Sequence, residues 1–124
     1  MIAYGWTEFN SIAAFFPEGF EPTGQEKYLF AWVVESENEV QSWLVEDSGW
    51  DGTIYDAASI DTARFVEKAE SLFHLPRKAI LPDLSWITKG WIVYEGSDEV
   101  SMVGEGAGRW LIVYYSLGSY AAEL

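Results

Sequence analysis

The sequence predicts an α+β fold: an antiparallel sheet of about five strands with two helices packed against it. Segments rich in β-branched and aromatic residues alternate with turns of Gly, Asp, Asn and Pro, which is typical of strands. Two other segments place apolar residues at helical spacing. The chain has 124 residues, of which 49% are apolar and 17% aromatic, enough for one domain with a sizeable core. We therefore expect a single domain over residues 1–124, with residues 118–124 as a frayed tail.

The first predicted helix follows Thr7, a suitable N-cap residue, and ends before Pro17. Its apolar residues follow the i, i+3, i+4, i+7 rule: Phe9, Ile12, Ala13 and Phe16. The second helix is predicted from Asp61 to His74, where Leu75 and Pro76 follow. Its apolar stripe consists of Ala63, Val66, Ala69 and Phe73.

Five segments are predicted as strands: residues 27–34, 39–45, 86–95, 99–103 and 110–115. The first and the last are apolar on both alternating faces, so we expect both to be covered on each side. Acidic turns at residues 35–38 and 96–98 are predicted as hairpin tips, and glycine-rich residues 104–108 as a loop. Residues 32–40 resemble residues 91–100, a similarity that we attribute to ordinary hairpin chemistry, with an internal duplication as the alternative.

The most unusual feature of the composition is its charge: 20 acidic residues face seven Lys and Arg, for a net charge of −13. Such a field repels nucleic acid and anionic membranes and attracts a cationic partner. Acidity alone would equally serve solubility, but here the signs are segregated. No Lys or Arg occurs from Tyr28 to Ala63 or from Gly90 to Gly108. Five of the seven basic residues lie between these stretches: Arg64, Lys68, Arg77, Lys78 and Lys89.

Several classes of protein are excluded or disfavoured. The chain has no cysteine, so disulfides, thiolate zinc sites and thiol catalysis are excluded. Its longest apolar runs, such as residues 110–115, are too short to cross a bilayer. Its first residues carry no basic region and no long apolar block, so we expect no secretory signal. We expect a cytoplasmic protein.

Two motifs resemble ligand-binding loops without meeting their requirements. The glycines of residues 104–108 precede Arg109 and a predicted strand, whereas a nucleotide-binding loop leads into a helix. Residues 47–52 begin like a calcium loop, but Gly49 stands at its third position and Ala58 at its twelfth, where Glu is needed. We expect no metal and no cofactor.

Catalysis is also not expected. His74 is the single histidine, and its place at a helix C-terminus favours a structural role with the helix dipole. Paired carboxylates beside seven Trp could line a sugar cleft, as in glycoside hydrolases. The acids, however, gather at predicted turns, where water keeps them ionised, whereas a general acid needs an apolar pocket. We expect a protein that is not an enzyme.

The predicted contact surface lies on the protruding acidic turns, with Trp50 as its aromatic anchor. The candidate partner-binding residues are Glu35, Glu37, Glu39, Glu46, Asp47, Trp50, Asp51, Tyr55, Asp98 and Glu99.

These features favour a small acidic inhibitor that binds and neutralises a basic protein, such as a nuclease toxin or a defence protein that acts on nucleic acid, by mimicking nucleic-acid charge. In general character the chain is similar to immunity proteins that neutralise bacterial toxins and to acidic phage-encoded inhibitors of host defence. The expected partner is a basic protein, with no nucleic acid or membrane bound, and the chain itself is expected to be a monomer or weak dimer. Two alternatives stay open: a small-molecule or carbohydrate-binding module that uses Trp and Tyr, and an accessory subunit of a larger assembly.

Overall fold

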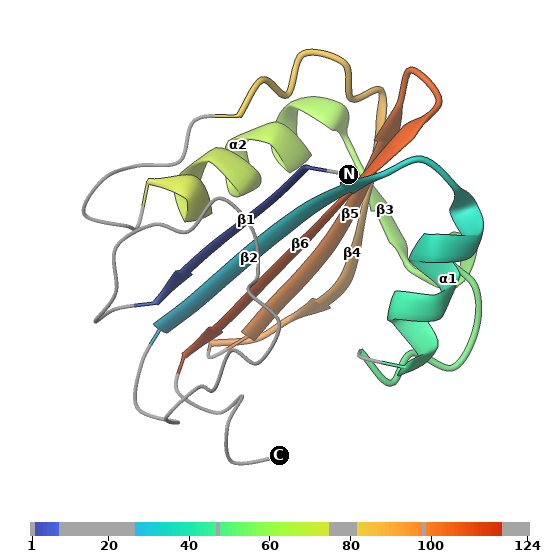
Figure 1. Cartoon of the computed structure of the whole chain (residues 1–124), viewed down its shortest axis with the longest axis horizontal. Coiled ribbons are helices and arrows are strands. Elements are labelled where there is room, and N and C mark those ends of the chain that lie inside the picture. The colour runs from blue at the N-terminus through green and yellow to red at the C-terminus, as the bar shows by residue number, and fades with distance from the viewer. Residues whose placement is uncertain (1, 8–26, 47, 75–81, 98, 118–124) are drawn as a thin grey trace.

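The computed structural model of the chain describes residues 2–7, 27–46, 48–74, 82–97 and 99–117 (Figure 1). In chain order, the elements are β1 (Ile2–Thr7), β2 (Lys27–Val34), α1 (Glu37–Glu46), the 3₁₀ turn η1 (Ile54–Asp56), β3 (Ala58–Ile60), α2 (Thr62–Phe73), β4 (Lys89–Glu95), β5 (Glu99–Gly106) and β6 (Arg109–Leu117).

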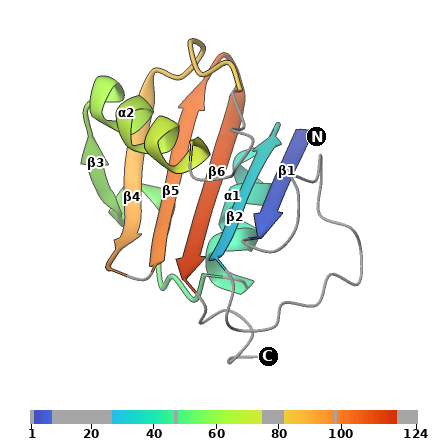
Figure 2. The ribbon, with the colours of Figure 1, turned by 90° about the vertical axis from the view of Figure 1, so that its left-hand side faces the viewer.

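The strands of the described residues form one six-stranded sheet in the order β1-β2-β6-β5-β4-β3 (Figure 2). Every neighbouring pair is antiparallel. The predicted α+β class is confirmed, with one strand more than the expected five or so. β6 lies between β2 and β5, so the chain returns to pair its last strand with one formed early in the sequence.

The two helices lie on opposite faces of the sheet (Figures 1 and 2). On one face, Phe65 and Phe73 of α2 pack into a buried cluster with residues of β2, β5 and β6. On the other face, Val40 and Leu44 of α1 join a cluster that contains Trp91 of β4. Strands between two such layers must be apolar on both faces. β2 and β6 were predicted to be covered on both sides, and their buried residues do divide between the two clusters.

Residues 39–45, predicted as a strand, lie instead in α1. Val40 and Leu44 are four residues apart and both fully buried, so they form one face of a helix. The helix start also has a recognisable cap: Ser36 Oγ accepts a hydrogen bond from the Glu39 amide, 3.2 Å away, and the Glu39 carboxylate accepts one from the Glu35 amide. The predicted hairpin at residues 35–38 is therefore wrong, and so is the proposed pair of similar hairpins.

Residues 104–108, predicted as a loop, belong mostly to two paired strands. Gly104 and Gly106 lie in β5, and only Ala107 and Gly108 form the turn into β6. Close packing explains why these two positions are glycine. A Cβ on Gly104 would lie 2.8 Å from the Phe65 ring, and a Cβ on Gly106 would lie 1.9 Å from the Trp86 carbonyl oxygen.

The second predicted helix is confirmed as α2, with Asp61 at its N-cap position and His74 at its C-cap. The predicted strand 86–95 begins later, at Lys89, and Trp86 lies before it with its indole N–H donating to the Asp83 carbonyl oxygen. β1 and β3 were not predicted.

The first predicted helix, at residues 9–16, lies outside the described residues, as do the connector at residues 75–81 and the tail at 118–124; Thr7, its expected cap, is the last residue of β1. In the part of the chain that the structure describes, no helix has the length and apolar character needed to span a membrane.

Candidate acidic binding surface

Seven of the ten candidate residues come together in one compact unit, residues 35–46 and 48–56, which we call the α1–η1 unit. Hydrogen bonds tie its loop to its helix. The Trp50 amide donates to the Leu44 carbonyl oxygen at 2.7 Å, and Gln41 Nε2 donates to the Gly52 carbonyl oxygen at 2.7 Å. The loop therefore has a defined path across the helix.

The α1–η1 unit is fixed to the sheet by buried apolar side chains. Val40, Leu44 and Ile54 are at most 1% exposed and pack in the same cluster as Trp91 and Trp110. Burial of side chains of this size contributes on the order of 1.5–3 kcal/mol each. The unit is thus held by core packing as well as by its own hydrogen bonds.

The outer surface of the unit is acidic. Its described carboxylates are all exposed: Glu35, Glu37, Glu39, Glu46, Asp51 and Asp56. The sequence places no Lys or Arg in this stretch. Among the described residues, none of these carboxylates forms an ion pair; the recorded pair is Lys68–Glu95, elsewhere on the fold. The negative charge of the unit is therefore not neutralised by the neighbouring described side chains.

Tyr55 is a partly exposed aromatic residue in this acidic surface. Its hydroxyl donates a hydrogen bond to Glu37 Oε1, and its ring meets Trp91 edge to face, with centroids 5.9 Å apart. Trp91 in turn stacks on Trp110 at 5.8 Å. The hydrogen bond to Glu37, and after it burial and the charges of Glu37 and Glu105, raise the pKa of Tyr55 to about 12.

Trp50, the predicted anchor, is half-buried and packs against the α1-side cluster. Its indole N–H donates to the Thr53 carbonyl oxygen at 2.9 Å. Next to it, Asp56 Oδ2 accepts hydrogen bonds from the Thr53 amide and hydroxyl. Asp56 was not among the candidate residues, although the Thr53–Asp56 spacing is a capping signal in the sequence.

Glu99 does not join the α1–η1 unit. It pairs with Ser116 at one end of the sheet, whereas Val34, which leads into α1, pairs with Trp110 at the other end. Asp47 and Asp98 lie outside the described residues. The predicted single surface is thus divided between two ends of the sheet.

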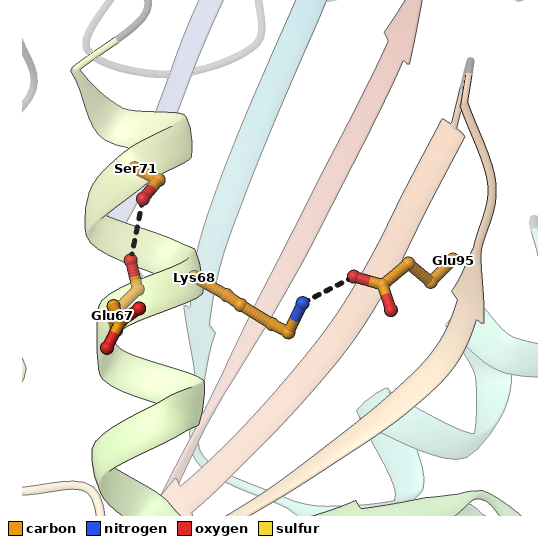
Figure 3. Close-up of polar contacts among 4 residues, drawn as sticks. All are labelled: Glu67, Lys68, Ser71 and Glu95. Carbon is orange, nitrogen blue, oxygen red and sulfur yellow. Dashed lines mark hydrogen bonds and ion pairs between the residues drawn. The ribbon is translucent and has the colours of Figure 1, made fainter.

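The opposite face of the molecule carries mixed charges. Lys68 Nζ of α2 lies 2.6 Å from Glu95 Oε2 at the end of β4, and Ser71 Oγ donates to the Glu67 carbonyl oxygen (Figure 3). A shallow groove of about 560 Å³ follows the outer side of α2, lined by Ala63, Val66, Glu67, Glu70, Ser71 and His74. The His74 amide donates to the Glu70 carbonyl oxygen at the end of the helix.

Among the described residues, no three His, Asp or Glu side chains are arranged to hold a metal ion. Comparisons of the chain with protein-family models, with curated proteins and with solved structures found no match.

Proposed function

We propose that this chain is a stoichiometric inhibitor that binds and neutralises a basic protein, of the kind that acts on nucleic acid as a toxin or a defence factor. The observation that supports the proposal is the α1–η1 unit. Its exposed carboxylates stand on a fixed scaffold, with no ion pair to a described cation. The inhibitor acts by occupying the partner's basic surface and performs no turnover of its own.

Charge of one sign on one surface favours fast and selective association. Complementary potentials steer the two proteins together and penalise partners of the wrong sign. A protein that binds nucleic acid presents Lys and Arg spaced to meet phosphates. Exposed carboxylates on a helix and the loop that follows can meet the same groups.

The fixed path of the loop lowers the cost of binding. Ordering interface loops and side chains costs free energy, roughly 0.5–1.5 kcal/mol for each immobilised side chain. In the α1–η1 unit, the hydrogen bonds of Gln41 and Trp50 already define the loop before any partner arrives. A larger share of the electrostatic attraction is then available as affinity.

The experiment compares two double charge reversals in a purified complex. The partner is obtained by affinity capture from cells that carry this gene, identified, purified and assayed for activity on nucleic acid. Glu46→Lys with Asp51→Lys changes two exposed residues of the α1–η1 unit. Glu67→Lys with Glu70→Lys changes two exposed residues on the opposite face. Both pairs change the net charge from −13 to −9, since each substitution adds two charges.

If the proposal is right, one equivalent of the wild-type chain abolishes the partner's activity, and the first double variant weakens binding by about 100-fold or more. The second double variant binds within a few-fold of wild type. Equal loss in both variants would show that only net charge matters. A captured partner that is acidic, or whose activity is unaffected, would contradict the proposal.

A further inference from the structure

Three large hydrophobic residues of the described chain are more than half exposed: Val45 at 55%, Tyr55 at 56% and Tyr94 at 54%. Exposed aromatic side chains that lie together mark interaction surfaces more often than single ones do. Tyr55 and Tyr94 would therefore mark an interaction surface if both lie on the same side of β4.

Tyr94 lies on the α1 side of the sheet. It pairs with Ser101 of β5, which is two residues from Val103, and Val103 belongs to the α1-side cluster. Residues paired across strands, and residues two apart along one strand, share a face. Tyr94 therefore lies on the same face as Trp91, which packs against Val103 in that cluster.

A β-bulge places Tyr94 there. Ile92 pairs with Met102 and Tyr94 pairs with Ser101, so Val93 is an extra residue in β4. Strict alternation from Trp91 would have turned Tyr94 toward α2. The bulge reverses this alternation, and it also turns Glu95 to the α2 side, where it meets Lys68 (Figure 3).

Tyr55 reaches the same strand from η1, because its ring contacts Trp91. Val93, between Trp91 and Tyr94, packs against the α1-side cluster. Tyr55, Trp91, Val93 and Tyr94 thus share the α1 side of β4, and we call this set the tyrosine stripe. Its two tyrosines are exposed, whereas Val93 is half-buried and Trp91 is buried. β3 pairs with β4 only from Gly90 to Ile92, so in the described part of the sheet no strand covers the outer edge of β4 at Tyr94, while its inner edge pairs with β5.

Carboxylates lie near the Tyr55 end of this stripe. Glu37 accepts a hydrogen bond from the Tyr55 hydroxyl, and Asp56 follows Tyr55 in the chain. The negative charge of Glu105 contributes to the raised pKa of Tyr55. An apolar aromatic centre with a charged rim is the usual anatomy of a protein interface, in which Tyr often supplies the largest energetic contributions.

We propose that the tyrosine stripe is the apolar centre of the contact surface for the basic partner, and that its occupant is a segment of that partner in which an apolar side chain is flanked by Lys or Arg. This inference rests on the proposed function for the sign of the partner's charge. It differs from the sequence-based expectation in the anchor, since Tyr55 and Tyr94 replace the half-buried Trp50.

Both tyrosines are held in place without a partner. Tyr55 is fixed by Glu37 and Trp91, and the Tyr94 ring lies over Gly96, where an added Cβ would come within 2.8 Å of the Tyr94 hydroxyl oxygen. Tyr also has few rotatable bonds, so its ordering on binding costs little. These properties suit an anchor better than they suit a merely solvent-exposed residue.

The test uses a displayed library of random dodecapeptides, selected on the full-length chain at low salt. We expect the enriched peptides to contain an aromatic or aliphatic residue flanked by Lys or Arg. Tyr55→Ser and Tyr94→Ser should each weaken the enriched peptides by about tenfold. Ala63→Ser, at an exposed residue of α2 on the opposite face of the sheet, is the control and should leave peptide binding unchanged.

Backbone amide shifts in the NMR spectrum of the wild-type chain provide a readout without mutation, and the peptide should shift the amides of Val93, Tyr94 and Gly96. If no peptide is enriched, or if peptide binding survives both tyrosine substitutions, the tyrosine stripe is not the centre of the contact surface. Peptides that need the tyrosines but lack Lys and Arg would contradict the cationic partner, and with it the proposed function. Cationic peptides that bind equally to both tyrosine variants would contradict the stripe alone.

Discussion

The hydroxyl of Tyr55 donates a hydrogen bond to Oε1 of Glu37, which joins η1 to the first turn of α1. This contact raises the pKa of Tyr55 to about 12 from its ordinary value near 10, because ionisation would place a phenolate against a carboxylate. We expect Glu37→Gln to move the pKa back toward about 10. The measurement is the near-ultraviolet absorbance of tyrosinate against pH, with Tyr55→Phe subtracted to isolate this residue.

The same contact gives stability a defined pH dependence. A folded-state pKa above the unfolded value means that the hydrogen bond stabilises the fold fully below about pH 10 and is lost as pH rises toward about 12. Unfolding in urea at several alkaline pH values should therefore show a steeper decline in wild type than in Tyr55→Phe. Parallel declines would show that Tyr55 ionises alike in both states.

Gly104→Ala should destabilise the fold by roughly 1–3 kcal/mol, because its Cβ would lie 2.8 Å from the Phe65 ring. Phe65→Leu removes the ring atoms that this Cβ would meet. We expect the double variant to lose less stability than the sum of the two single variants. Urea unfolding of the four proteins measures this coupling, and strict additivity would contradict the close approach of Phe65 to β5.

Ala107→Asn should stabilise the protein, by part of the roughly 1–2 kcal/mol that the left-handed conformation costs an ordinary L residue. Ala107 has φ = 52° in the two-residue turn between β5 and β6, and Gly108 has φ = 73°. Two positive φ values favour Asn-Gly, since Asn tolerates the left-handed region better than Ala does. Ala58→Asn, at an exposed alanine of β3, is the control and should not stabilise the protein. A lower midpoint of urea unfolding for Ala107→Asn would contradict the turn geometry.

The sequence predicted strands correctly where the hydrophobic pattern was compatible with only one kind of element. β2 and β6 are continuous apolar segments, and such segments have few solutions other than buried strands. α2 has caps and a clear apolar stripe, so its bounds were predicted closely. α1 was wrongly predicted because its two buried residues, Val40 and Leu44, fit either period over so short a segment. The Ser36–Glu39 capping pair was the signal that could have decided it.

The predicted surface was harder to derive than the fold. Local sequence placed the carboxylates from Glu35 to Asp51 together, because one helix and one loop carry them. It could not place Glu99 relative to them, since that distance depends on strand order and register. Tyr94 was not a candidate for the same kind of reason. A single extra residue in β4 decides its face, and no composition or period reveals a bulge of this kind.

Calcium should have little effect on thermal stability. Asp51 lies exposed in the loop of the α1–η1 unit, and Asp47 lies outside the described residues. A site with a dissociation constant near the millimolar range would add about 1 kcal/mol or less at millimolar Ca²⁺. Melting temperatures in EDTA and in millimolar Ca²⁺ should therefore agree closely. If Ca²⁺ raises the melting temperature strongly, and Asp51→Asn abolishes that increase, the loop binds the ion.

Association with the basic partner should slow steeply as salt increases. The exposed carboxylates of the α1–η1 unit act at a distance only where the Debye length is long, about 30 Å at 0.01 M salt against about 8 Å at 0.15 M. We expect the association rate constant to fall by roughly tenfold or more over this range, while the dissociation rate constant changes less. Stopped-flow mixing at several salt concentrations measures both.

The variant with Glu46→Lys and Asp51→Lys should have a flatter salt dependence than the one with Glu67→Lys and Glu70→Lys, although their net charges are equal. If the two slopes coincide, the whole molecule steers association and the α1–η1 unit has no special part in it; if the wild-type rate does not change with salt, the acidity serves solubility alone.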